Sequence, residues 1–109
     1  MEIHYADIKK LIPDLWESFM TFVTSSPVVA MVWEGTDIIK TGRKIIGATK
    51  PVDHAMGTIR GNNSVGLPKN IVHASDCVEA ANKEIAHWFK ESELIPWNHN
   101  ADTWVSGVN

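Results

Sequence analysis

The chain has 109 residues, of which 44% are hydrophobic and 21% are charged, a balance that fits a single folded domain and excludes a disordered chain. The formal net charge of −3 excludes a general electrostatic attraction to nucleic acid or anionic lipid, so any phosphate group must be recognised locally. The single cysteine, Cys77, excludes an internal disulfide, and we expect it to be a small buried residue in a reducing compartment.

The N-terminal third is predicted to be mainly helical. Residues 2–10 are expected to form a helix, and Pro13-Asp14 restarts the chain as a second helix, so that the two pack as a hairpin. Residues 27–33 form an apolar run between turn residues. A run of that length is more typical of a buried strand than of a helix.

A third helix and a long connection follow. Thr36 or Asp37 is expected to cap this helix, and Gly47 to end it. Residues 48–69 are rich in glycine, proline and asparagine and have almost no apolar periodicity. Connections of this length are usually functional.

The C-terminal part contains the second predicted strand, at residues 71–73. Asp76 and Glu79 have the spacing of a capping box, which predicts the start of a helix. From Lys90 the chain is expected to form an irregular wrap. With no repeat and no linker visible, residues 1–109 are predicted to be a single domain.

Two kinds of signal are absent from the sequence. The first residues contain neither a basic nor an apolar targeting region, and no stretch approaches the roughly 18 apolar residues of a membrane span, so we expect a cytoplasmic protein without membrane contact. The five histidines never stand at H-x3-H spacing and no cysteine cluster lies beside them. We therefore predict no metal site made of protein side chains.

His73 is the strongest candidate for chemistry. It lies in the run Asn70-Ile71-Val72-His73-Ala74-Ser75-Asp76, where an apolar strand meets a helix start, and Glu84 follows in that helix. Imidazole can accept a phosphoryl group because part of it is uncharged at neutral pH, and a carboxylate on the other ring nitrogen fixes its tautomer. From the residues alone, a hydrogen-bonded histidine near a helix cap remains the alternative.

The run around His73 resembles the signature of the nucleoside diphosphate kinase family, which is Asn, two β-branched residues, His, Gly or Ala, Ser and Asp. All of these positions conform. The resemblance covers nearly the whole chain from His4 onward. Further matching stretches are Ser26–Gly35, Thr41–Arg43, Gly47–Pro51, Gly57–Gly61, Trp88–Phe89 and Trp104.

The resemblance implies an α/β fold, an α+β sandwich in which a ferredoxin-like antiparallel sheet packs with helices. Family members are longer, and the N-terminal β-α-β portion, with a phosphate-binding Lys in a Lys-Pro-Asp motif, has no counterpart here. The family's first strand would lie between 27–33 and 71–75. Without it, those two strands would have no common neighbour, and unpaired backbone groups destabilise a fold.

The implied function is that of a nucleoside diphosphate kinase. A Mg²⁺-bound nucleoside triphosphate would pass its γ-phosphoryl group to His73, and a nucleoside diphosphate would then collect it in a ping-pong reaction. The Mg²⁺ would be held mostly by phosphates and water. The implied catalytic residues are His73, Glu84 bonded to its ring, Ser75 supporting that carboxylate, and Tyr5 close to the phosphohistidine.

The resemblance also implies nucleotide-binding residues. Arg43 and Arg60 would bind the phosphates, because guanidinium forks suit phosphate oxygens, and Thr49 would add a hydroxyl donor. Asn70 would contact the sugar and phosphates. For the arginines, surface salt bridges are the alternative interpretation.

The nucleobase would be held mainly by stacking, with low base specificity. Counting back from the strand places Leu15 at the family's aromatic position and Phe19 nearby, with Trp16 adjacent as a possible ring. Leu67 takes the aliphatic position near the end of the loop. Alternatively, these are core residues.

Some residues depart from the family pattern and leave a second function open. Pro68 replaces a loop glycine, Lys69 a usual arginine and Asn62 an acidic residue. The alternative function is a non-catalytic nucleotide-binding subunit or fragment that associates with full-length chains. Homo-oligomers and mixed oligomers are both open, a chain that does not fold alone is a third possibility, and no specific nucleic acid is predicted as a partner.

Overall fold

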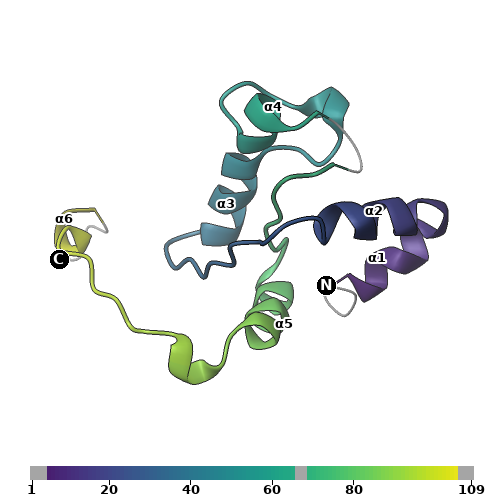
Figure 1. The fold of residues 1–109 in the computed structure, drawn as a ribbon. Helices are drawn as coiled ribbons and strands as arrows, with labels where there is room; N and C mark the ends of the chain where they lie inside the picture. The colour runs from purple at the N-terminus through teal and green to yellow at the C-terminus, as the bar shows by residue number, and fades with distance from the viewer. Residues whose placement is uncertain (1–4, 66–68, 106–109) are drawn as a thin grey trace.

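The computed structural model describes residues 5–65 and 69–105. Near the N-terminus, α1 (Ala6–Leu11) and α2 (Trp16–Val23) are joined by the 3-10 turn η1 (Pro13–Leu15) and form a hairpin (Figure 1). A proline is favoured at the first position of a helix because it has no N–H to satisfy and its φ is already helical. The predicted restart of the chain at this proline is confirmed.

The third helix, α3 (Ile38–Ile46), ends at Gly47 as predicted. Gly47 has a φ of 91°, a conformation that side-chain-bearing residues rarely adopt. A Cβ atom at this position would also lie 2.5 Å from the Thr58 hydroxyl oxygen. At the other end, Asp37 is the N-cap residue with a φ of 51°, and its side chain makes no capping hydrogen bond.

The long connection contains two short elements, η2 (Pro51–Asp53) and α4 (Ile59–Asn63). Thr58 caps α4, because its hydroxyl accepts from the Gly61 N–H at 2.9 Å and donates to the Ala55 carbonyl at 2.7 Å. A Cβ atom on Gly61 would lie 1.8 Å from that carbonyl oxygen. The helix therefore depends on a cap and a close backbone approach, neither of which produces apolar periodicity.

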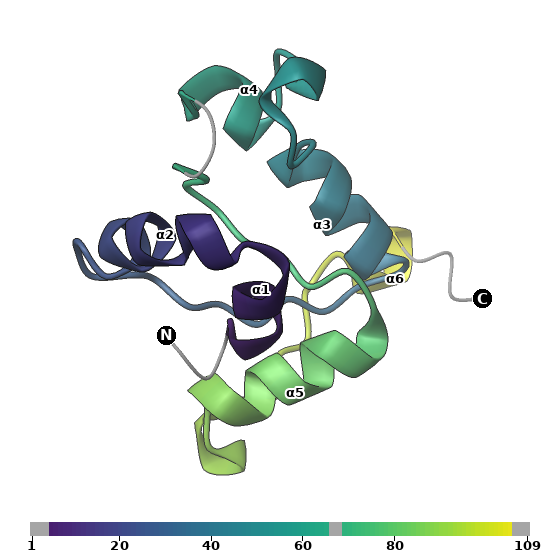
Figure 2. The ribbon, with the colours of Figure 1, turned by 90° about the vertical axis from the view of Figure 1, so that its right-hand side faces the viewer.

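The two predicted strands are not formed within the described residues. Neither 27–33 nor 71–73 belongs to a β-ladder there, and both follow an open trace (Figures 1 and 2). A strand needs a neighbour for its backbone N–H and C=O groups, and the described ranges offer none. The first run is left exposed, with Val29 at 85% and Trp33 at 65%.

The longest helix, α5 (Val78–Trp88), starts differently from the prediction. Cys77 is its N-cap residue, and its sulfur accepts from the Ala80 N–H at 3.4 Å. The predicted capping box of Asp76 and Glu79 is therefore wrong, because the helix begins one residue later than that box requires. The expectation that Cys77 is buried is also wrong, since the residue is exposed.

The C-terminal tail is largely irregular, as predicted, with the short elements η3 (Glu91–Glu93) and α6 (Asp102–Val105). It extends away from the other helices instead of wrapping over them (Figure 1). Trp97 is 79% exposed and Trp104 is 87% exposed. Within the described ranges, no helix is long and apolar enough to cross a membrane.

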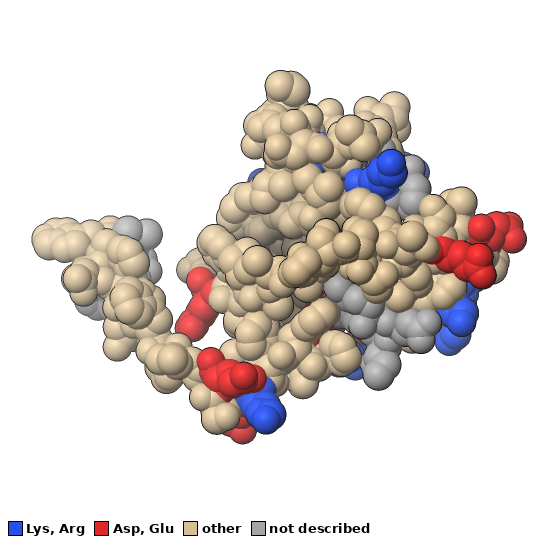
Figure 3. All heavy atoms as spheres, viewed as in Figure 1, with Lys and Arg blue, Asp and Glu red and all other residues tan. Residues whose placement is uncertain are grey.

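Little apolar surface is buried. Among the described residues, the buried side chains are Trp16 at 8%, Ile46 at 6% and Arg60 at 3% exposure. The radius of gyration is 16.1 Å. A compact chain of this length would have about 13 Å. On the face in Figure 3, charged side chains lie mostly toward the margins and the middle is largely uncharged.

The exposed run at 27–33 predicts self-association through its backbone edge. Val29→Lys is expected to reduce concentration-dependent association in sedimentation velocity, because a lysine on an exposed edge opposes strand pairing. Val52, on η2, is 87% exposed and Val29 is 85% exposed, so Val52→Lys is a matched control. Equal association of the two variants would contradict the prediction.

Candidate functional site

His73, Glu84 and Ser75 lie together. The Nε2 atom of His73, just before α5, is 2.9 Å from Oε1 of Glu84 on that helix. The Ser75 hydroxyl donates to the other carboxylate oxygen of Glu84. The His73 side chain is 40% exposed and that of Glu84 is 25% exposed. The ring is thus oriented by a carboxylate that is itself held, and solvent still reaches it.

Tyr5 forms one wall of this site. Its ring packs edge-to-face against His73, with centroids 6.0 Å apart, and against Phe19 of α2, with centroids 4.8 Å apart. Burial raises the pKa of Tyr5 above its ordinary value of 10.0, and the nearby Glu84 carboxylate raises it further, whereas the Arg60 guanidinium lowers it. The phenol therefore stays protonated at neutral pH.

Arg60 is the most buried charged side chain among the described residues. Its Nη1 donates to the Gly47 carbonyl at 2.8 Å and to the Thr49 hydroxyl at 3.4 Å. Its Nη2 donates to the Val72 carbonyl at 2.9 Å. Burial lowers the pKa of Arg60, and the nearby positive charge of Arg43 lowers it further.

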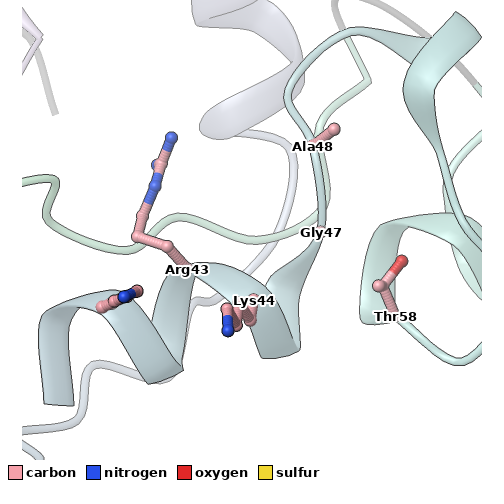
Figure 4. A pocket seen from close by; sticks show the side chains of 6 residues that line it. Arg43, Lys44, Gly47, Ala48 and Thr58 are labelled. Carbon is pink, nitrogen blue, oxygen red and sulfur yellow. The ribbon is translucent and has the colours of Figure 1, made fainter. Parts of the chain in front are cut away.

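Arg43 reaches the same segment from α3. Its Nη1 donates to the Ala74 carbonyl at 3.2 Å, and its side chain is half-buried. Arg43 and Lys44 project from α3 in different directions, and Thr58, the residue that precedes α4, lies beyond Gly47 (Figure 4). Both of the sequence-predicted phosphate-binding arginines therefore bond to the backbone of the segment that carries His73, one at the residue before it and one at the residue after it.

A shallow hollow of about 440 Å³ lies beside Arg43. It includes two cationic residues that the sequence analysis does not single out, Lys40 and Lys44. Their spacing could have identified them, because residues 40, 43 and 44 are three and four positions apart and so lie close together on a helix surface. The lining residues are Lys40, Arg43, Lys44, Gly47, Ala48 and Thr58.

The remaining predicted polar residues occupy different environments. Thr49 is exposed and accepts the long hydrogen bond from Arg60. Asn70 is half-buried, and its Oδ1 atom is buried without a hydrogen-bond partner among the described residues. Leaving such an acceptor unpaired is destabilising, so this oxygen needs a donor that the described residues do not provide.

The predicted base-stacking residues are only partly brought to the site. Phe19 lies next to Tyr5, with Trp16 behind it at 6.0 Å between ring centroids. Trp16 is buried, so its ring faces are covered, whereas Leu15 is 51% exposed. Leu67 lies outside the described residues.

The donor set does not favour a metal held by the protein alone. In the part of the chain that the structure describes, no group of three His, Cys, Asp or Glu side chains is placed to hold an ion. His73 contacts one carboxylate, and two guanidinium groups bond to the carbonyls of the residues before and after it. This arrangement suits an anionic ligand that brings its own cation.

Comparisons with known protein families and structures all match this chain to the same family. Residues 1–94 match the family model described as nucleoside diphosphate kinase. A nucleoside diphosphate kinase of Drosophila yakuba is 47% identical over 96% of this chain and 69% of its own length. One of Neurospora crassa is 46% identical over 96% of this chain and 68% of its own length. This chain therefore spans about two-thirds of these relatives.

The fold of the chain is similar to that of a solved member. The crystal structure of a nucleoside diphosphate kinase family protein from Babesia bovis superposes with a TM-score of 0.83 and is 38% identical. The match covers 95% of this chain and 69% of that protein. The arrangement of elements is thus the family's, even though the described residues contain no β-ladder.

The single tyrosine allows a direct test of the electrostatics around His73. Glu84→Gln is expected to lower the pKa of Tyr5 toward 10.0, because the carboxylate helps to raise it. Tyrosinate absorbance near 295 nm during alkaline titration measures this pKa. Glu79→Gln, an exposed site on the same helix, is the control and should leave the titration unchanged.

The raised pKa of Tyr5 also determines how the stability of the folded chain changes with pH. Because the folded-state pKa of Tyr5 is raised, its contribution to stability is fully present below pH 10.0 and is lost as the pH rises through the folded-state pKa. A Tyr5 that titrates at its ordinary pKa in the folded chain would contradict this account.

Proposed function

This chain belongs to the nucleoside diphosphate kinase family of phosphotransferases, and we propose that His73 is the residue that carries the phosphoryl group. The observation that supports this assignment most is the hydrogen bond between His73 Nε2 and Glu84. It fixes which ring nitrogen is protonated. The other nitrogen, Nδ1, then has the lone pair that a nucleophile needs.

The proposed reaction has two in-line transfers. The lone pair of His73 Nδ1 attacks the γ-phosphorus of a nucleoside triphosphate, and the bond from that phosphorus to the oxygen bridging the β-phosphate breaks. The nucleoside diphosphate leaves with the electron pair of this bond. In the second transfer, a terminal β-phosphate oxygen of another nucleoside diphosphate attacks the phosphohistidine, and Nδ1 regains its lone pair. The proton stays on Nε2 of His73 and is donated to Glu84, which stabilises the positive charge that the ring carries while the phosphoryl group is attached.

Positive charge near the transferred group comes from Arg43 and Arg60, with Thr49 as a hydroxyl donor. Each guanidinium has five N–H donors, so one that already holds a backbone carbonyl retains donors for phosphate oxygens. Asn70 is proposed to contact the sugar and phosphates with its unpaired acceptor and its amide. Tyr5 is proposed to border the phosphoryl group beside the His73 ring.

Mg²⁺ is proposed to enter with the nucleotide, as part of the substrate. It is then held mostly by phosphate oxygens and water. Bound in that way, the ion offsets negative charge on the phosphates. For the base, we propose stacking against Leu15, Phe19 and Leu67, which gives low base specificity.

The wider assignments are proposals of the same kind. We propose one domain over residues 1–109, located in the cytosol. We also propose that the family's ferredoxin-like antiparallel sheet forms when 27–33 and 71–75 obtain neighbouring strands. The exposed valines of the first run support this, as does the additional length of the relatives outside the match.

A second candidate is a non-catalytic nucleotide-binding subunit that joins full-length chains in mixed oligomers. Arg60 supports it, because this side chain is only 3% exposed and its guanidinium is already bonded to backbone carbonyls. The exposed apolar run at 27–33 would then be covered by the other subunit. Nucleotide binding without phosphoryl uptake would favour this candidate over the enzyme.

Incubation with γ-labelled ATP and Mg²⁺ tests the phosphohistidine. We expect acid-labile label on the chain that a nucleoside diphosphate removes, and His73→Gln should abolish it completely. His87→Gln, an exposed histidine of α5, is the control and should keep the label. Label retained in His73→Gln would overturn the assignment.

Glu84→Gln tests the orienting carboxylate. A hydrogen bond to a charged group contributes about 1.5 to 3 kcal/mol, so its loss should slow label uptake by roughly 10- to 150-fold. Rapid-quench measurement at saturating nucleotide gives this rate, and Glu79→Gln serves again as the control. An unchanged rate in Glu84→Gln would contradict the orienting role.

A further inference from the structure

We propose that Arg43 and Arg60 position His73 through its backbone, as two guanidinium clamps on the carbonyl groups that flank it. The inference rests on the proposed role of His73 and adds a function for these arginines before any nucleotide is bound. Each clamp is a positioning device, distinct from the phosphate contacts proposed above.

The contacts are specific to the two residues on either side of His73. Arg60 Nη2 donates to the carbonyl of Val72 at 2.9 Å, and Arg43 Nη1 donates to the carbonyl of Ala74 at 3.2 Å. These are the only two arginines in the sequence. Both arginines of the chain therefore donate hydrogen bonds to the same short segment.

The segment needs such donors. Backbone carbonyls that are removed from water must find hydrogen-bond partners. The carbonyls of a strand usually find them in a β-ladder. Residues 71–75 belong to no ladder within the described part of the chain. The two guanidinium groups supply donors that a neighbouring strand would otherwise provide.

The two arginines connect the segment that carries His73 to α3. Arg43 belongs to α3, and Arg60 also donates to the carbonyl of Gly47 at the end of α3, at 2.8 Å. The imidazole of His73, in contrast, is held from α5 by Glu84. The backbone beside His73 is thus held from α3 and α4 and its ring from α5, which fixes where Nδ1 can lie.

The charges indicate why arginine is suited to this position. The two guanidinium groups are near enough for Arg43 to lower the pKa of Arg60, so two like charges are held close together. An incoming phosphoryl group carries the charge that this arrangement lacks. Arg43, which is half-buried, can therefore place the nucleophile first and meet the anion afterwards, whereas Arg60, at 3% exposure, contributes its charge without direct contact.

Nuclear magnetic resonance of the nucleotide-free chain in phosphate-free buffer tests the clamps. Arg43→Lys is expected to move the carbonyl carbon resonance of Ala74 and to leave that of Val72 in place. Arg60→Lys is expected to do the reverse. Lys83→Arg, an exposed site on α5, is the control and should move neither resonance. Unchanged carbonyl resonances in both arginine variants would overturn the proposal.

A kinetic measurement separates positioning from phosphate binding. If the arginines position His73, Arg43→Lys should lower the rate of label uptake at saturating ATP by roughly 10- to 150-fold, the loss expected for one charged hydrogen bond. A variant that only needs more ATP to reach an unchanged maximal rate would overturn the positioning role. Arg43 is half-buried and makes one of these bonds, so this variant decides the question if Arg60→Lys does not fold. If the unmodified chain takes up no label, the proposed function fails, while the carbonyl resonances still decide whether the clamps exist.

Discussion

The buried guanidinium of Arg60 is the interaction on which the arrangement of this chain depends. Moving a cation out of water is unfavourable unless hydrogen bonds replace its hydration. The two terminal nitrogens of Arg60 meet this condition with oxygen atoms of Gly47, Thr49 and Val72, whereas its Nε is buried without a hydrogen-bond partner among the described residues. One side chain therefore joins the end of α3, the start of the following connection and the segment that carries His73. Loss of any of these acceptors would leave a buried charge without its partner.

The candidate active site follows from this connection. Phosphoryl transfer asks a protein mainly to place groups and to stabilise charge, and little covalent chemistry is required beyond the nucleophile. Here His73 is held by Glu84 on one side and flanked by two guanidinium groups on the other. The groups that the proposed transfer needs thus lie together even though 71–75 has no neighbouring strand within the described residues.

Local features could be predicted from the sequence, and non-local ones could not. The helix end at Gly47 depends on one residue's backbone freedom, so the sequence predicts it directly. The predicted strand at 27–33 is not formed in the described part of the chain, because a strand needs a neighbouring strand to pair with, and the composition of one segment does not reveal whether such a neighbour is present. The burial of Arg60 could not be predicted from the sequence either, because its main acceptors are backbone carbonyls, which every residue has. The spacing of His73 and Glu84 suggested proximity, and only the structure supplied the contact between their atoms.

Identification of the phosphorylated ring nitrogen is the most direct test of this account. The chain would be labelled with ¹⁵N-histidine, phosphorylated with ATP and Mg²⁺, and studied by ³¹P and ¹⁵N resonance at alkaline pH, where phosphohistidine persists. The account predicts phosphorus bonded to Nδ1 of His73, with the proton on Nε2 beside Glu84. Phosphorus on Nε2, or a chain that never carries phosphohistidine, would contradict it.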